Sequence, residues 1–237
     1  EPEGDDLVVD NNSTDIDINL LQEPLRVLYV EGVPRWEYRY LKNLLLREDS
    51  IESSIMLLSA DRSFAQEGDR PISRLPVTAG EFDDFDVVII GDVPAGVMSP
   101  DQHHLLQESV ASGGTGVLWI GGEESTPRTW GESNSASLLP FTQPFDLPAI
   151  GSPIQMKPTE EAERIGVLRL DDGDTSSWPA ALTDEKNDWS KIQWSQWIPK
   201  ERLKPTSSVL AETVRFKDND ENIPIVIDSR YGLGRSI

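Results

Sequence analysis

The chain has 237 residues, and 42 Asp and Glu against 21 Lys and Arg give it a formal net charge of −21. This excess of negative charge argues against a protein that wraps nucleic acid or an anionic membrane, because both require a positive surface. The absence of cysteine excludes disulfides, zinc–thiolate sites, iron–sulfur clusters and a cysteine nucleophile. The two histidines, His103 and His104, are adjacent and poorly placed to share one metal ion. We therefore expect neither a metal nor a cofactor.

The negative charge is concentrated at the start of the chain. Residues 1–24 contain eight acidic and no basic side chains, so they carry −8 of the −21. The alternating stretch DIDINL at 15–20 is compatible with an edge strand. We interpret 1–24 as an acidic linker, or as an edge strand from a preceding domain. A calcium site is the sharper alternative, but the segment has no 12-residue ligand loop with a central glycine.

The chain has no apolar run of the ~18 residues that a membrane span requires, and it does not begin with a signal-peptide pattern. We therefore expect a soluble segment. The start is an acidic stretch without Met, and the end, IPIVIDSRYGLGRSI at 223–237, stops in an apparent strand. Such a strand would leave its backbone groups without pairing partners. We infer a piece of a longer protein, with a domain at 25–237 that is truncated at its C-terminus.

From residue 25 onward, strand and helix patterns alternate. Helical spacing predicts a helix at 34–49, with Trp36, Tyr40 and Leu44 on one face. A second helix is expected at 99–114, where Ser99 is a natural N-cap. Short apolar runs closed by glycine or polar residues predict buried strands at 25–32, 50–60, 85–92 and 115–122. This order predicts a mostly parallel sheet with helices on both faces.

After Pro140 the pattern changes, because prolines crowd and the apolar runs shorten. We expect further strands joined by long loops in this C-terminal part. Four of the seven tryptophans lie here, and they could form a platform for a sugar or peptide, or anchor a small core. Trp194 and Trp197 are three residues apart, a spacing that would align them on a helix. The four are Trp178, Trp189, Trp194 and Trp197.

Three blocks of the sequence together resemble one family. They are VLYVEGVPRWEYRYLKNLL at 27–45, SGGTGVLWIGGEEST at 112–126 with WGESNSASLLPF at 130–141, and IPIVIDSRYGLGR at 223–235. They are similar to the class I glutamine amidotransferase-like superfamily, in the branch found in large, uncharacterised bacterial membrane-associated proteins. The resemblance implies a flavodoxin-like α/β fold.

The chain departs from the active members of that superfamily at the catalytic residues. Active members carry a cysteine on a sharp strand-to-helix elbow, with a His and a Glu downstream. The corresponding elbow here is the turn after VLWI, which holds Gly121, Gly122 and Glu123, and both histidines precede it. A nucleophile needs a base within hydrogen-bond reach, and the chain offers neither partner. We therefore expect no glutaminase activity and no catalytic residue of that kind.

Polar residues follow several predicted strands, and the carboxyl ends of parallel strands share one edge of a sheet, where ligands bind. One interpretation is a site for a polar small molecule or peptide, with Arg35 or Arg39 holding an anion. The other is a set of ion pairs that join loops at the sheet edge. The candidate ligand-binding residues are Glu31, Arg35, Arg39, Asp92, Gly121, Gly122, Glu123 and Trp130.

The sequence therefore favours a non-catalytic interaction or ligand-sensing domain with a degenerate amidotransferase-like fold. The alternative is a hydrolase of another kind, with carboxylates at the sheet edge. The adjacent histidines fit a structural role, one facing solvent and one the sheet. Expected partners are other domains of the parent chain or other proteins, with a small polar ligand as a further option. We expect neither nucleic acid nor direct membrane insertion, and we favour the extracytoplasmic side of a membrane-anchored parent.

Overall fold

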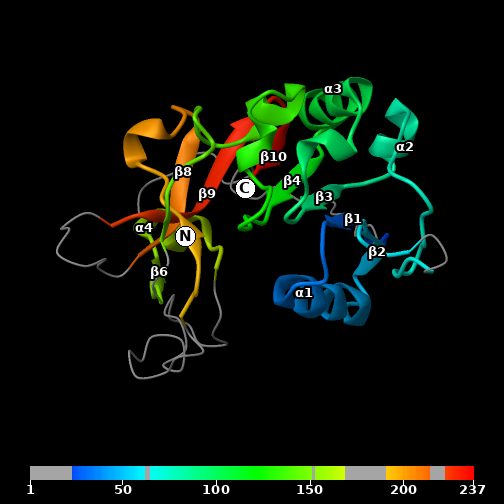
Figure 1. Ribbon diagram of the computed structural model, residues 1–237, viewed down its shortest axis with the longest axis horizontal. Helices are drawn as coiled ribbons and strands as arrows, with labels where there is room; N and C mark the ends of the chain where they lie inside the picture. The colour runs from blue at the N-terminus through cyan, green and yellow to red at the C-terminus, as the bar shows by residue number, and fades with distance from the viewer. Residues whose placement is uncertain (1–22, 62–64, 151–152, 169–190, 214–221) are drawn as a thin grey trace, which may run out of the picture.

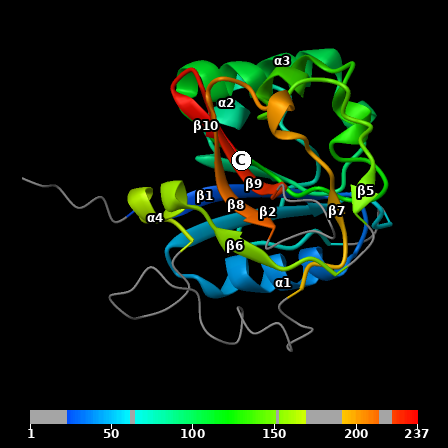
Figure 2. The ribbon, with the colours of Figure 1, turned by 90° about the vertical axis from the view of Figure 1, so that its left-hand side faces the viewer.

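The computed structural model describes residues 23–61, 65–150, 153–168, 191–213 and 222–237. The four helices of this part are α1 (Trp36–Arg47), α2 (Ala79–Asp83), α3 (Pro100–Glu108) and α4 (Glu160–Ile165). Figure 2 shows α1 on one face of the main sheet, with α2 and α3 on the opposite face. The predicted α/β class, with helices on both faces of a sheet, is therefore confirmed.

The main sheet has eight strands and two halves of different character (Figure 1). The first five strands in spatial order are parallel to one another, and the last three pair antiparallel. In spatial order they are β2 (Ile51–Leu57), β1 (Leu25–Glu31), β3 (Val87–Ile90), β4 (Gly116–Trp119), β10 (Gly234–Ser236), β9 (Pro224–Tyr231), β8 (Ser207–Thr213) and β6 (Met156–Pro158). A separate two-stranded sheet pairs β5 (Ala149–Ile150) with β7 (Ser195–Gln196).

The apolar runs form strands that are buried on both faces. In β1 every residue from Val27 to Glu31 is buried, because β2 and β3 flank the strand and helices cover both sides of the sheet. Tyr29 lies in register with Ile55 on one side and Ile89 on the other. Near-continuous apolar runs, instead of alternating ones, are typical of such parallel strands.

The expectation that the last strand would lack partners is wrong. β9 pairs with β8, and β10 lies between β9 and β4. Arg235 of β10 is in register with Gly116 of β4, although the two are far apart in sequence. Such long-range pairing is not visible in local sequence patterns, which is why the prediction failed.

The expected helical alignment of Trp194 and Trp197 is also wrong, because strand β7 separates them. Trp197 packs against a small cluster of Ile150, Ile154 and Ile223. This contact favours the core interpretation over an aromatic platform for this ring. Trp178 and Trp189 lie outside the described residues.

Helix α3 confirms both the predicted cap and the predicted role of the histidines. Ser99 and Gln102 form a capping box at its start. His103 is buried, with Nδ1 3.0 Å from the Ser135 hydroxyl and Nε2 3.0 Å from the Ala95 carbonyl oxygen, whereas His104 is exposed. Because a carbonyl oxygen only accepts, Nε2 donates to Ala95 and Nδ1 of the neutral ring accepts from Ser135.

Acidification should destabilise the fold through His103. Burial lowers the pKa of His103, so below about pH 6.5 the unfolded chain binds a proton that the folded chain resists. Above that pH, His103 makes no pH-dependent contribution to the free energy of unfolding. As the pH falls toward the lowered pKa of His103 in the folded state, the free energy of unfolding decreases progressively. Urea unfolding between pH 7.5 and 5.5 measures the loss, which His103→Gln should remove. The matched control His104→Gln, at an exposed position, should retain it; equal pH profiles for the two variants would contradict this assignment.

No helix within the described ranges is long and apolar enough to cross a membrane.

Candidate functional site

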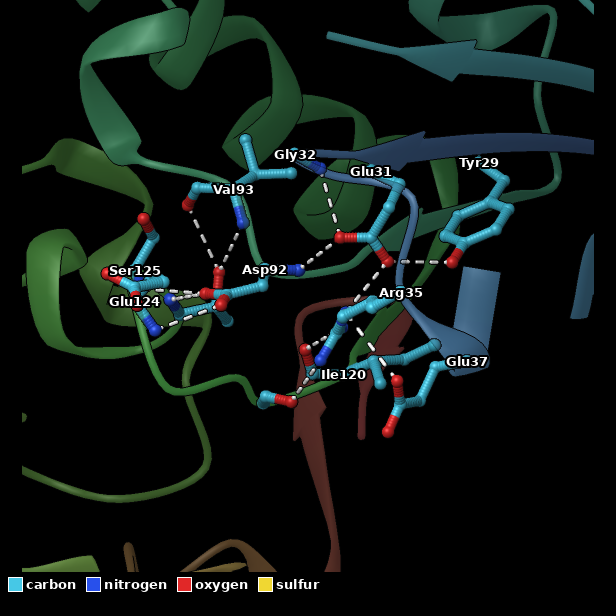
Figure 3. A network of polar contacts seen from close by, with 12 residues as sticks. Tyr29, Glu31, Gly32, Arg35, Glu37, Asp92, Val93, Ile120, Glu124 and Ser125 are labelled. Carbon is cyan, nitrogen blue, oxygen red and sulfur yellow. Dashed lines mark hydrogen bonds and ion pairs between the residues drawn. The ribbon is translucent and has the colours of Figure 1, made fainter. Parts of the chain in front are cut away.

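The carboxyl ends of β1, β3 and β4 meet at one edge of the sheet (Figure 3). Glu31 is the last residue of β1, Asp92 follows β3, and Gly121 and Gly122 follow β4. These positions converge because the three strands are parallel neighbours. Arg35, which precedes the first residue of α1, reaches into the same cluster.

Glu31 is the centre of this cluster and has no exposed surface. Its Oε2 accepts from the Tyr29 hydroxyl at 2.8 Å and from Arg35 Nε at 3.1 Å. Its Oε1 accepts from the backbone N–H groups of Gly32 at 3.0 Å and Asp92 at 2.9 Å. A side chain at Gly91 would overlap this carboxylate, so glycine is required there. Four donors therefore satisfy the buried charge.

Arg35 connects β1 to the turn after β4. Besides the Glu31 ion pair, its guanidinium donates to the carbonyl oxygens of Gly121 at 2.9 Å and Ile120 at 3.1 Å. The Arg35 side chain is only 17% exposed. A guanidinium has a rigid fork of donors, and here that fork is occupied by protein acceptors. Arg35 thus closes the edge between the two strands instead of presenting its charge to solvent.

Asp92 organises the loop after β4. Its carboxylate accepts the backbone N–H groups of three consecutive residues, at 3.0 Å from Glu124, 2.6 Å from Ser125 and 2.8 Å from Thr126. A side chain on Gly122 would overlap this carboxylate. In the turn that holds Gly121, Gly122 and Glu123, Asp92 therefore fills the space beside Gly122.

Two further residues belong to the network, although sequence reasoning did not single them out. Tyr29 lies two residues before Glu31 on the same side of β1, a spacing that could have indicated the contact. Burial, reinforced by the negative charge of Glu31, raises the pKa of the Tyr29 hydroxyl, which therefore stays protonated and donates. Thr126 Oγ1 accepts from Val93 N and donates to Val93 O, both at 3.1 Å. No local pattern indicated the role of Thr126.

Three candidate residues lie outside the network. Arg39 lies over the Trp36 ring on α1, 5.8 Å from its centroid, and Glu123 is exposed in the loop after β4. Trp130 is fully buried, packs edge-on against Trp119 and donates from its indole N–H to Val93 O at 2.9 Å. Because it has no exposed surface, Trp130 serves the core and offers no face to a ligand.

Two hollows in the described part of the surface lie away from this edge. One of about 330 Å³ is lined by residues between Ser54 and Phe85, and another of about 160 Å³ by residues between Trp197 and Pro224. Neither is lined by a candidate residue. Within the described ranges, no group of three His, Cys, Asp or Glu residues could hold a metal ion.

Comparison with known proteins connects this architecture to solved folds. No family model matches the chain, and no curated protein matches it. A cytoplasmic protein from Salmonella typhimurium shares 12% sequence identity over 90% of this chain and 85% of its own, with a TM-score of 0.59. A ThuA-like protein from Bacteroides uniformis shares 13% identity over 94% and 85%, with a TM-score of 0.47. At such identities the first likeness shows the fold alone, an α/β fold with a mainly parallel sheet.

Proposed function

We propose that the chain is a non-catalytic interaction domain with a degenerate glutamine amidotransferase-like fold. The observation that carries this proposal is the occupied elbow, where the Asp92 carboxylate takes the space of a side chain on Gly122. The carboxylates of Glu31 and Asp92 are bonded to the protein's own donors. An acid–base catalyst must reach its substrate, so this arrangement also weighs against the hydrolase alternative.

The strand order supports the flavodoxin-like part of the proposal. The parallel half runs β2-β1-β3-β4-β10, which corresponds to the order 2-1-3-4-5 of doubly wound flavodoxin-like sheets. The resemblance of the three sequence blocks supports a further proposal. The domain would belong to a bacterial membrane-associated protein and lie on the extracytoplasmic side of the membrane. Its partners would then be neighbouring domains of that protein or other proteins.

A thermal-shift screen separates an interaction domain from a ligand sensor. The chain would be screened against polar metabolites, including glutamine, other amino acids, sugars and nucleotides. The protein's own groups occupy the polar positions at the sheet edge. We therefore expect no metabolite to raise the Tm in a dose-dependent way by binding to the exposed candidates Arg39 and Glu123. A rise that Arg39→Gln or Glu123→Gln abolishes would replace the interaction proposal with ligand sensing. The control Glu108→Gln carries an exposed substitution on α3, on the opposite face of the sheet.

A further inference from the structure

Strand β2 is the first strand in the order of the main sheet, so within the described ranges one of its sides has no strand beside it (Figure 1). The backbone groups on such a side pair readily with another chain, and natural proteins cover or block them. Residues 66–70 lie along this side of β2, and we call them the strap. Gly68 of the strap forms an isolated antiparallel bridge with Ser54 of β2. The strap therefore takes the place of a neighbouring strand.

Two side chains of the strap bind the backbone of β2. The Asp69 carboxylate accepts from Ser53 N at 2.9 Å and from the Ser53 hydroxyl at 2.8 Å. The Gln66 amide accepts from Leu57 N at 2.8 Å and donates to Leu57 O at 3.3 Å. The Gln66 side chain thus makes the two bonds that a residue of a paired strand would make. Side chains therefore satisfy the backbone at both ends of the outer side of β2.

The middle of the strap is held by its backbone and by helix α1. Ile55 N donates to Glu67 O at 3.2 Å. The Glu67 carboxylate accepts from the Tyr38 hydroxyl at 2.8 Å and from Lys42 Nζ at 2.9 Å, and both donors belong to α1. The strap is thus fastened to α1 as well as to β2. It nevertheless lies at the surface, where Asp69 is exposed, so it can leave β2 without opening the core.

The N–H groups that β2 directs toward the strap are arranged symmetrically. They belong to Ser53, Ile55 and Leu57, with Ile55 at the centre. Two copies of β2 that pair antiparallel about a two-fold axis at Ile55 place Ser53 of each copy opposite Leu57 of the other. The same three N–H groups then find carbonyl acceptors. The adjacent Glu52 lies opposite Leu58 in this pairing, so like charges do not meet.

We propose that the strap controls self-association of this chain through β2. When it is docked, the strap blocks the outer side of the strand, and when it is released, two copies join their sheets through a symmetric β2–β2 pair. The self-complementary spacing of the three N–H groups favours a second copy of the chain over an unrelated extended segment as the partner. The proposal does not depend on whether the carboxyl edge of the sheet is catalytic or binds a ligand.

The substitution Gly68→Ala tests the proposal, because it displaces the strap without altering β2. A methyl group on Gly68 would lie 2.6 Å from Ser53 O, and the φ of +114° strains any residue other than glycine. Gly96→Ala is the matched control, since a methyl group there would have no neighbour within 4 Å. In sedimentation equilibrium, we expect Gly68→Ala to dimerise at a concentration at least about tenfold lower than the native chain or the control, because weakened strap contacts compete less with pairing.

Amide hydrogen exchange followed by NMR identifies the surface of association. In the Gly68→Ala variant, the N–H groups of Ser53, Ile55 and Leu57 should exchange rapidly at low protein concentration and become protected as the dimer forms. The native chain should protect them at every concentration. A second variant, Gln66→Ala with Asp69→Ala, removes both side-chain acceptors and leaves Gly68 unchanged, and it should also dimerise more readily than the native chain.

Three results would overturn the proposal. The first is a Gly68→Ala variant that is folded by circular dichroism and dimerises no more readily than the native chain. The second is a dimer in which the N–H groups of Ser53, Ile55 and Leu57 gain no protection, because association would then use another surface. The third is a native chain that already associates as strongly as both variants, since the strap would then block nothing. If Gly68→Ala does not fold, the same measurements on the Gln66→Ala, Asp69→Ala variant decide the outcome.

Discussion

Replacement of Arg35 by Met should lower the free energy of unfolding by about 3–5 kcal/mol, the usual cost of removing one partner of a buried ion pair. Glu31 has no exposed surface, and Arg35 is its charged partner at 3.1 Å. The replacement also leaves the carbonyl oxygens of Ile120 and Gly121 without their guanidinium donors. Urea denaturation followed by circular dichroism measures the change.

Arg39→Met is the matched control for Arg35→Met. It removes the same side chain from an exposed position on α1 and should change stability by no more than about 0.5 kcal/mol. The double variant Glu31→Gln with Arg35→Met should recover part of the loss, because it no longer buries an unpaired charge. A loss below about 1 kcal/mol for Arg35→Met would contradict the structural role of the ion pair.

Gly122→Ala should be the second most damaging change, with a loss of about 2–4 kcal/mol from overpacking and broken hydrogen bonds. The added methyl group would overlap the Asp92 carboxylate. Asp92 cannot move away without releasing the three backbone N–H groups of residues 124–126. The conflict is specific to Gly122, because a methyl group on Gly121 would meet its nearest neighbours, the Trp194 ring and Thr126 O, only at ordinary contact distances of 3.7 and 3.9 Å.

Gly80→Ala provides the control for Gly122→Ala. Gly80 lies in helix α2, and a methyl group there would have no neighbour within 4 Å. That variant should be neutral or slightly more stable, by up to about 1 kcal/mol, since alanine restricts the unfolded chain. Equal Tm values for the Gly122 and Gly80 variants would show that the elbow has space for a side chain.

The convergence of Glu31, Asp92 and Gly121 could be predicted from the sequence, but that of Arg39 and Trp130 could not. Glu31, Asp92 and Gly121 each follow an apolar run, and neighbouring parallel strands bring such positions to one edge. What could not be predicted is that the polar groups bond to one another. The choice between a pocket and a closed network depends on atomic distances, such as those from Asp92 to the 124–126 backbone.

The orientation of α1 shows a second limit of sequence reasoning. Trp36, Tyr40 and Leu44 have helical spacing, but so do Tyr38, Leu41 and Leu45, and periodicity alone cannot decide which set faces the sheet. In the structure the second set faces inward. This orientation is partly fixed by a residue outside the helix. The Tyr38 hydroxyl donates to the Glu67 carboxylate at 2.8 Å, and Lys42 Nζ donates to the same carboxylate at 2.9 Å.

The C-terminal half was the least predictable part of the fold. Of the short runs after Pro140, those at 208–212 and 223–228 form strands as expected, whereas residues 166–168 follow helix α4 and are not in a strand. The runs did not indicate the direction of the strands or their neighbours. β8 and β9 pair antiparallel, and β10 then joins the parallel half beside β4. These contacts join segments that are distant in sequence, so local patterns contain little information about them.

A glutamine hydrolysis assay tests the central claim most directly. Purified chain would be incubated with glutamine at high concentration, and ammonia release would be compared with a protein-free reaction. Because the elbow carries no nucleophile and Asp92 occupies the adjacent space, we predict the same rate with and without the protein. The account would be contradicted if ammonia release rose in proportion to protein concentration and fell in the variants Asp92→Ala or Glu31→Gln. That result would identify the closed sheet edge as a catalytic site.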